Sequence, residues 1–182
     1  MPEKVVYLMR GLPSCGKSHL ARRLAGSEGV ILETDAYFQC EGDEPRFADM
    51  TDEQILAEAR RWNLEQFRQA VAAQRTPIVV DRGNGLSTES YQYARHALDN
   101  GYEVQLKEPD SDWWQEIRVL LRYKEITKPI LDAWADKLAQ LSDSHHGVKA
   151  DRIRQLMDAW QDGLTVEDLL RFGEANTSFS RE

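Results

Sequence analysis

The stretch at residues 5–25, "VVYLMRGLPSCGKSHLARRLA", limits what this 182-residue chain can fold into more than any other part of it. Its first apolar run, Val5–Met9, predicts a buried strand, and the periodic pattern from about Lys17 to Ala25 predicts a helix. Between the two, "GLPSCGKS" fits the pattern G-x-x-x-x-G-K-[ST] at Gly11, Gly16, Lys17 and Ser18. A strand, a glycine loop and a helix in this order predict a phosphate-binding loop.

A loop of this kind turns several backbone N–H groups toward one point. We expect the N–H groups from Ser14 to Ser18 to converge on phosphate oxygens, and the following helix to add its positive dipole end. Lys17 would bridge the β- and γ-phosphates, and Ser18 would bind Mg²⁺. The alternative is a glycine turn into a helix with an exposed lysine. The nucleotide-binding residues predicted in this way are Gly11, Pro13, Ser14, Cys15, Gly16, Lys17, Ser18 and His19.

Cys15 stands at a loop position where related loops usually carry serine or glycine. A thiol beside Lys17 and near a helix N-terminus is expected to ionise more readily than a free cysteine, because both features favour the thiolate. It would then react quickly with alkylating agents, and bound nucleotide would shield it. The alternative left open by the sequence is that the side chain points away from the phosphates and fills a small space.

Three more apolar runs continue the alternation of strands and helices. They are Val30–Asp35, Pro77–Asp81 and Tyr102–Pro109, and helix-periodic stretches separate them. The stretch 51–75 opens with "TDEQ", which resembles a capped helix N-terminus, and the stretch 87–101 ends in glycine. Crossovers of this length imply parallel strands with helices on both faces, so the predicted fold class is α/β.

The remainder of the chain is expected to be helical, in segments 111–126, 129–141 and 149–163. The last residues, 173–182, are expected to form a flexible tail. The length fits one compact unit, so we predict a single P-loop domain over residues 1–172.

Two aspartates end apolar strands and are candidates for the chemistry. Asp81 has the arrangement of a Walker B carboxylate that holds Mg²⁺ through water, and its alternative role is a turn former or helix cap. Asp35 could accept the proton of an attacking hydroxyl, and its alternative role is a helix N-cap.

The composition limits the kinds of molecule that the protein is expected to bind. Lys and Arg total 23 against 31 for Asp and Glu, which gives a net charge of −8 and a pI near 5.1. This balance argues against binding long duplex DNA, although a local basic groove could hold a strand end. The only cysteines are Cys15 and Cys40, and the chain shows neither a signal-peptide pattern nor an apolar run long enough to span a membrane. We therefore expect a cytoplasmic protein with no membrane partner.

Six segments occur in the order found in the polynucleotide-kinase-like P-loop proteins: "RGLPSCGKS", "TDAYF", "VVDRGN", "GYEV", "EPDSDWW" and "HGV". The chain resembles, over roughly residues 5–160, the predicted kinases related to the kinase domain of a ubiquitin-ligase-binding polynucleotide kinase. The resemblance implies an adenylate-kinase-like P-loop fold. In that fold, a parallel sheet of about four or five strands has helices on both faces and a helical lid, and the Walker B strand lies beside the P-loop strand.

The resemblance also implies roles for single residues. Lys17 and Ser18 would contact ATP and Mg²⁺, and Asp35 would be the general base. Asp81 and Asn84 would occupy a D-x-x-N segment beside the acceptor, with Arg82 between them. Glu89 matches a glutamate of the following helix, and "HGV" at residues 146–148 matches a segment near the lid.

The chain departs from the family pattern around the acceptor. Arg82 and Gly83 replace an amide and a hydroxyl, and Phe38 stands where end-healing polynucleotide kinases have an arginine. Asp143 and Ser144 replace the arginine and asparagine usual before "HGV", and residues 125–142 resemble an inserted helix. These departures leave the phosphate chemistry in place and bear on the identity of the acceptor.

A lid has to bring cations to the charge that develops on the transferred phosphoryl group. Arg118 and Arg122 are the candidates, because their i, i+4 spacing puts both on one helix face, and the alternative is a solvated charged face. Trp113 and Trp114 could stack on a nucleobase, or be divided between core and surface. His145 and His146 lack the partners of a zinc site, so zinc is not expected.

Together these observations predict an ATP- and Mg²⁺-dependent kinase that transfers the γ-phosphoryl group to a hydroxyl, with the 5′-hydroxyl of a short or single-stranded nucleic acid as the acceptor. Two alternatives stay open. One is a small-molecule or nucleotide kinase of the same fold, favoured by the acidic pI and by Phe38. The other is a nucleotide-dependent switch or binding module in which Asp35 serves only as a cap.

Overall fold

The computed structural model describes residues 3–39, 51–142 and 147–179, and for residues 35, 38, 39 and 177–179 it describes only the backbone. Four parallel strands form its sheet in the order β2-β3-β1-β4. Their bounds are β1 (Val5–Met9), β2 (Val30–Glu33), β3 (Ile78–Asp81) and β4 (Glu103–Lys107). The α/β class and the placement of the strand that ends at Asp81 beside the first strand are confirmed.

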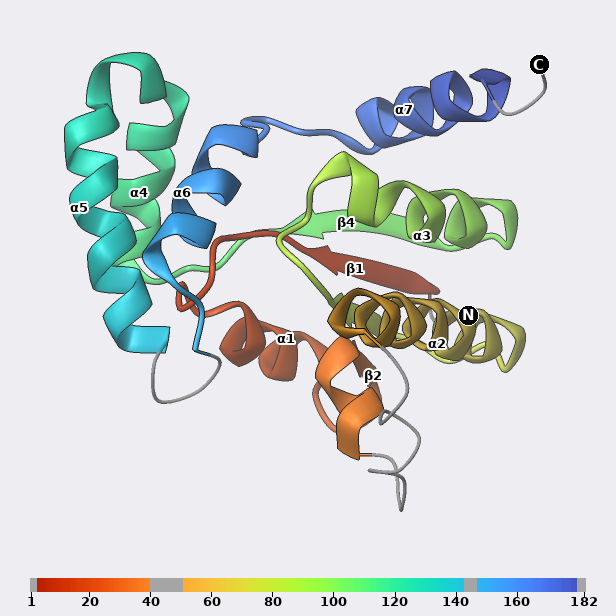
Figure 1. Ribbon diagram of the computed structural model, residues 1–182. Coiled ribbons are helices and arrows are strands. Elements are labelled where there is room, and N and C mark those ends of the chain that lie inside the picture. The colour runs from red at the N-terminus through yellow and green to blue at the C-terminus, as the bar shows by residue number, and fades with distance from the viewer. Residues whose placement is uncertain (1–2, 40–50, 143–146, 180–182) are drawn as a thin grey trace.

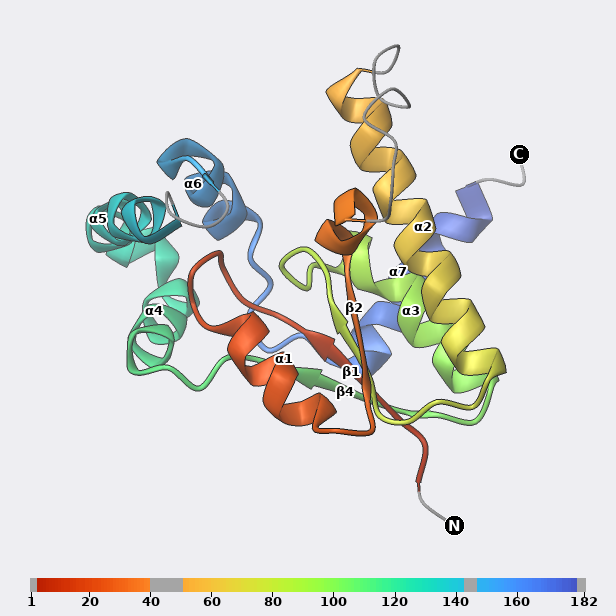
Figure 2. The same ribbon diagram turned by 90° about the horizontal axis from the view of Figure 1, so that it is seen from below.

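Helices cover both faces of this sheet (Figures 1 and 2). On one face lies α1 (Lys17–Ala25), and on the other lie α2 (Asp52–Ala72) and α3 (Ser87–Asp99). The predicted cap of α2 is present, because Thr51 and Gln54 exchange side-chain to backbone hydrogen bonds of 3.2 and 2.8 Å. These helices explain why the strands are apolar on both faces.

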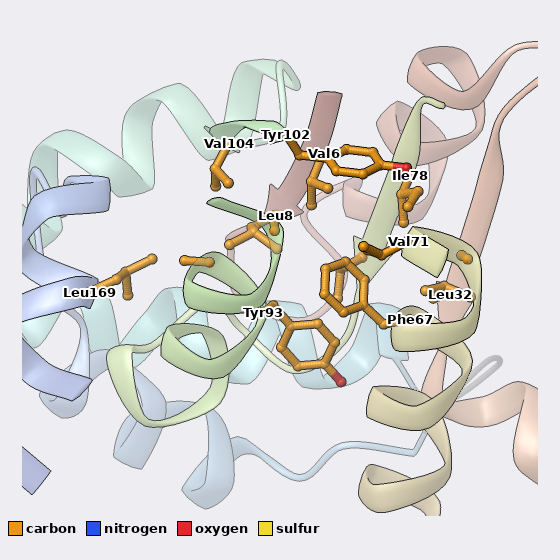
Figure 3. Packing of buried hydrophobic residues seen from close by; sticks show 14 residues of the cluster. Val6, Leu8, Leu32, Phe67, Val71, Ile78, Tyr93, Tyr102, Val104 and Leu169 are labelled. Atoms are coloured by element: carbon orange, nitrogen blue, oxygen red, sulfur yellow. The ribbon is translucent and has the colours of Figure 1, made fainter. Parts of the chain in front are cut away.

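The main core lies between the sheet and the α2–α3 layer (Figure 3). Alternate strand residues point into it, including Val6, Leu8 and Ile78, and the ring of Phe67 meets that of Tyr93 edge-on at 5.0 Å. On the opposite face of the sheet, Met9 and Val79 pack against α1. The period-two alternation of strand side chains thus fixes which residues face each helical layer.

A separate group of three helices follows β4 and lies at the side of the sheet, beyond the loop that follows β1 (Figures 1 and 2). We call it the α4–α6 bundle; it comprises α4 (Asp112–Arg122), α5 (Lys124–Ser142) and α6 (Ala150–Ala159). The sequence predicted a helix through residue 126 and a new one at Pro129, but the break falls at Tyr123 and Pro129 lies inside α5. Pro129 is the sixth residue of α5, beyond the first turn, so it has no N–H to donate to the carbonyl of Glu125 and costs the helix one backbone hydrogen bond.

The chain then crosses back over the sheet to α7 (Val166–Phe179), which packs on α3 (Figure 1). The sequence predicts a tail from residue 173, and in the structure α7 continues through this segment as far as Phe179. Leu169 is fully buried in the main core, and Thr165 and Asp168 cap the helix start through bonds of 3.0 and 3.2 Å. Burial of this apolar face stabilises the helix despite Gly173.

The second strand is also shorter than predicted. β2 ends at Glu33, and residues Thr34–Gln39 form a short 3₁₀ helix. The reason is that Glu33 pairs with Asp81, the last residue of β3, so the ladder has no further partner. No helix of the described ranges is long and apolar enough to cross a membrane.

Candidate phosphate-binding site

The loop between β1 and α1 has the backbone geometry of a phosphate cradle. Gly16 precedes α1 with φ 99° and ψ 18°, and Ser14 has φ 64°, so both lie in left-handed conformations. Neither Gly16 nor any side chain described here caps the first turn of α1. A helix N-terminus with free N–H groups at a glycine turn is suited to bind an anion.

Lys17 lies at the centre of the site. Its Nζ donates to the carbonyl oxygens of Gly11 at 2.9 Å and Gly83 at 2.6 Å, and to Oδ1 of Asn84 at 3.2 Å. Burial lowers the pKa of Lys17, while the negative charge of Asp81 acts to raise it. A partly desolvated ammonium held by neutral oxygens attracts a phosphate strongly, because little water has to be removed.

Ser18 and Asp81 meet at the carboxyl ends of two neighbouring parallel strands. Ser18 Oγ donates to Oδ2 of Asp81 at 2.7 Å. A hydroxyl and a carboxylate are oxygen ligands of the kind that Mg²⁺ prefers, and Mg²⁺ usually takes one or two protein ligands besides phosphates and waters. Within the described ranges no three His, Cys, Asp or Glu side chains cluster as metal ligands. The pair therefore suits an ion that is bound together with a phosphate group.

The segment after β3 is held by one glutamate. Glu89, in the first turn of α3, accepts the backbone N–H groups of Asn84 at 3.2 Å and Leu86 at 3.1 Å. An ideal Cβ on Gly83 would lie 1.7 Å from Oε2 of Glu89, so a larger residue would displace this carboxylate from the N–H groups that it accepts. Asn84 joins this segment to the phosphate loop, because its backbone carbonyl accepts the N–H of Gly11 at 3.2 Å. The phosphate loop and residues 82–86 thus form one hydrogen-bonded unit.

Arg82 points toward α3 in this structure. Its Nη1 donates to the carbonyl of Glu89 at 2.9 Å. The sequence placed Arg82 beside the acceptor, next to Asn84. Asn84 has a side chain that contacts Lys17 in the site, whereas the described contact of Arg82 goes to α3.

The expectation of a reactive thiol is wrong for Cys15. Its side chain is fully buried among Leu12, Trp114 and Ile117, on the side of the loop that faces the α4–α6 bundle. Burial raises its pKa from 9.0 to about 12, and this outweighs the lowering by Lys17. The alternative, a small side chain that fills space behind the loop, is the one observed, so Cys15 can contribute only its backbone to a phosphate.

The start of α4 fastens the outer side of the loop. Ser111 Oγ donates to the carbonyl of Cys15 at 2.8 Å, and Trp113 Nε1 donates to the carbonyl of Ser14 at 3.0 Å. A Cβ on Gly11 would lie 3.0 Å from Cδ of Pro109, so a larger residue would require Pro109 to shift. These contacts turn two loop carbonyls away from the phosphate position.

The two adjacent tryptophans have different environments. Trp114 is fully buried and meets Trp160 edge-on at 5.1 Å, so it cannot stack on a nucleobase. Trp113 is 39% exposed beside the loop. The pair is thus divided between core and surface, as one of the two sequence hypotheses stated.

The candidate lid arginines also differ. Arg122 forms an ion pair with Asp162 at 3.1 Å, whereas Nε of Arg118 is buried without a hydrogen-bond partner among the described groups. Asp35 lies in the 3₁₀ helix after β2, but its side chain, like that of Phe38, is outside the described residues. The same is true of His145 and His146. The roles predicted for these residues stay predictions.

Sequence reasoning missed Arg10 and Gln161. Arg10, directly before the first loop glycine, is only 1% exposed, and its Nε donates to the carbonyl of Gly85 at 3.1 Å. Gln161 Oε1 accepts both the N–H and the hydroxyl of Ser87 at 2.9 Å. The only signal in the sequence was for Arg10, a charged residue between an apolar strand and a glycine loop.

Comparisons with known proteins agree with this geometry. The family model described as AAA domain (AAA_33) matches residues 6–118, more than half of the chain. A human protein described as NEDD4-binding protein 2 is 30% identical over 164 residues, which are 89% of this chain and 8% of that protein. The chain therefore spans a small part of the length of this curated relative.

Two solved structures are similar to the whole chain. One, described as a candidate kinase from Chloroflexus aurantiacus, has a TM-score of 0.52 at 9% identity, and the match covers 98% of both chains. The other, from the PezAT chromosomal toxin–antitoxin system of Streptococcus pneumoniae, has a TM-score of 0.49 at 13% identity, with 98% of this chain and 87% of that chain covered. The first similarity is evidence for the fold.

Proposed function

Because this chain belongs to the AAA domain family, whose model matches residues 6–118, we propose that it is a P-loop kinase that transfers the γ-phosphoryl group of ATP to a hydroxyl. The observation that carries the proposal is the convergence of Lys17, Ser18 and Asp81 at the carboxyl ends of β1 and β3. Ligands of open α/β sheets bind at this edge.

The phosphate loop would bind the β- and γ-phosphates with the backbone N–H groups from Ser14 to Ser18. Lys17 would exchange the carbonyl oxygens of Gly11 and Gly83, which it now contacts, for phosphate oxygens. Ser18 and Asp81 would hold Mg²⁺, which neutralises charge on the phosphates when it is bound. Asn84 would keep Lys17 oriented toward the transferred group.

Asp35 is the proposed general base. It follows β2, the strand next to β3, so its backbone lies at the same edge of the sheet as Asp81. We expect Asp35→Asn to retain ATP affinity and to lose transfer, because the amide keeps the shape but cannot take a proton. Nucleotide titration and turnover on the same preparation test this. If both quantities fall together, or neither falls, the base is another group.

The proposed acceptor is the 5′-hydroxyl of a short or single-stranded nucleic acid. The support is the ordered set of segments shared with polynucleotide-kinase-like proteins, from the phosphate loop to "HGV". With a net charge of −8, the protein would hold a strand end through local contacts rather than through a long basic surface.

The acceptor can be identified by transfer of radiolabel from [γ-³²P]ATP. The panel contains 5′-hydroxyl single-stranded DNA and RNA, the same strands carrying a 5′-phosphate, nucleosides, and small hydroxylated metabolites. Labelling of the 5′-hydroxyl strands alone supports the proposal. Labelling only of nucleosides or metabolites would replace the acceptor, and no labelling with intact Mg·ATP binding would favour a nucleotide-dependent binding module.

A further inference from the structure

We propose that Arg10 is a positioning residue that fixes the phosphate loop, residues 82–86 and both chain connections of the α4–α6 bundle in one arrangement. The kinetic part of this inference rests on the proposed kinase function. The structural part does not, because it concerns contacts that exist without any substrate.

Arg10 is an unusual residue for its place. It follows β1 and precedes the phosphate loop, and its side chain is only 1% exposed. Burial lowers its pKa, although the charges of Glu108 and Asp162 act in the opposite direction. A buried guanidinium is costly unless its N–H groups form hydrogen bonds, and both Nε and Nη2 of Arg10 do so.

The contacts of the guanidinium go to three separate segments. Nε donates to the carbonyl of Gly85 at 3.1 Å, and Nη2 donates to the carbonyl of Gln161. Nη1 lies 3.8 Å from Oε2 of Glu108, and the ring of Trp160 covers the group with its centroid 4.4 Å from Cζ. A planar fork with donors on several sides can make these contacts together, whereas a lysine ammonium cannot.

Two of these segments are the places where the chain enters and leaves the α4–α6 bundle. Glu108 lies between β4 and α4, and Trp160 and Gln161 follow α6. The first connection is strengthened by Trp114, whose Nε1 donates to Oε1 of Glu108 at 3.1 Å. Both ends of the bundle are therefore fastened to one side chain.

The third segment, residues 82–86, lies on the side of the site where the acceptor is proposed to bind. An ideal Cβ on Gly85 would lie 2.2 Å from Cγ of Arg10, so the backbone of Gly85 rests directly on the arginine stem. The neighbouring Asn84 contacts Lys17 and the N–H of Gly11. A shift of Arg10 would thus move the groups beside Lys17 without breaking the backbone cradle.

The first variant to measure is Arg10→Lys, which keeps the charge and the stem but loses the fork. The cradle N–H groups belong to α1 and its preceding turn, so the Kd for Mg·ATP should change less than about threefold. Turnover needs residues 82–86 and the bundle in place, so kcat should fall tenfold or more. A residue that only stabilised the fold would lower the melting temperature without this split between Kd and kcat.

Hydrogen exchange of the ligand-free protein tests the arrangement without relying on transfer. In Arg10→Lys, the amides of Ser87 and Trp160 should exchange at least tenfold faster, because Ser87 donates to Gln161 and Trp160 itself lies against the guanidinium of Arg10. Amides in the centre of α2 should change much less. The matched control is Arg154→Lys, since Arg154 pairs with Asp136 and Asp151 inside the bundle and does not reach the loops.

If Arg10→Lys does not fold, Glu108→Gln decides the question, because it keeps the shape of the side chain and all groups that contact Ser87, but removes the negative charge 3.8 Å from Nη1 of Arg10. It should give the same pattern with a smaller amplitude. Equal acceleration of exchange in α2 and at Ser87, or no acceleration at all, would overturn the positioning role. So would a parallel loss of ATP affinity and kcat. A wild-type protein without transfer activity would refute the kinase proposal, while exchange would still decide the role of Arg10.

Discussion

Cys15 gives a quantitative test of how the phosphate loop is packed. Below pH 9, a rise of the pKa from 9.0 to about 12 lowers the thiolate fraction about a thousandfold relative to the unfolded chain. Because the thiolate is the reactive species, alkylation should slow by at least the same factor, and the complete burial of the side chain slows it further.

The assay needs a protein with one thiol. Cys40→Ser leaves Cys15 as the only cysteine, since the chain has two. We expect iodoacetamide at pH 8 to label the native variant at least about a thousandfold more slowly than the same variant in denaturant, as followed by intact mass. Native labelling within tenfold of the denatured rate, with circular dichroism showing a folded protein, would refute the buried placement.

The same pKa predicts a loss of stability at high pH. The folded state keeps the Cys15 proton up to about pH 12, whereas the unfolded chain releases it near pH 9, so the folded state binds more protons in this interval. The contribution of the thiol is therefore fully present below pH 9 and falls by about 1.4 kcal/mol per pH unit above it. Urea unfolding of Cys15→Ala between pH 8 and 10 should show a shallower decline than the parent, which separates this effect from other groups, such as Tyr93, whose pKa is also raised.

Two further substitutions test the packing around the site. Leu169→Ala removes a fully buried side chain that joins α7 to the main core, so urea unfolding should show a loss of about 2–5 kcal/mol; a loss below 0.5 kcal/mol would mean that α7 does not pack as described. Gly83→Ala should cost about 1–3 kcal/mol, because the methyl group would collide with Glu89 at a residue with φ 63°; wild-type stability in this variant would contradict the contact.

The strand and loop geometry could be predicted because it depends on local pattern and on general rules of topology. Lys17 and Ser18 follow from the glycine motif, and the approach of Asp81 to Ser18 follows from two parallel strands that end at one edge of the sheet. The motif also indicates where the backbone needs positive φ angles, and both of its glycines, Gly11 and Gly16, have them.

Side-chain directions in the loop could not be predicted, because distant residues set them. Cys15 turns away from the site because α4 packs behind the loop, and Ser111, which fastens it, is 96 positions further along the chain. Arg82 turns toward α3 through a contact that is closer in sequence, since its Nη1 donates to the carbonyl of Glu89. For the two tryptophans the local sequence did contain a signal, because only Trp114 has the i+3 and i+7 spacing to the buried Ile117 and Leu121.

The last helix was missed although the sequence contained a signal for it. "TVED" at residues 165–168 fits a capping pattern before an apolar run, and the structure shows both of its hydrogen bonds. Gly173 and the polar residues after it instead indicated a tail without helical structure. Packing on α3, where Gly173 approaches the ring of Tyr91, outweighs this low local propensity.

The most direct test of the central claim is single-turnover transfer from Mg·[γ-³²P]ATP to a 5′-hydroxyl oligonucleotide by the wild type and by Lys17→Ala. The charge of Lys17 acts where negative charge develops on the transferred group, so the rate should fall roughly a hundredfold or more while the circular dichroism spectrum stays unchanged. Transfer by Lys17→Ala at the wild-type rate, with any acceptor that the wild type labels, would contradict the assignment of this loop as the catalytic phosphate site.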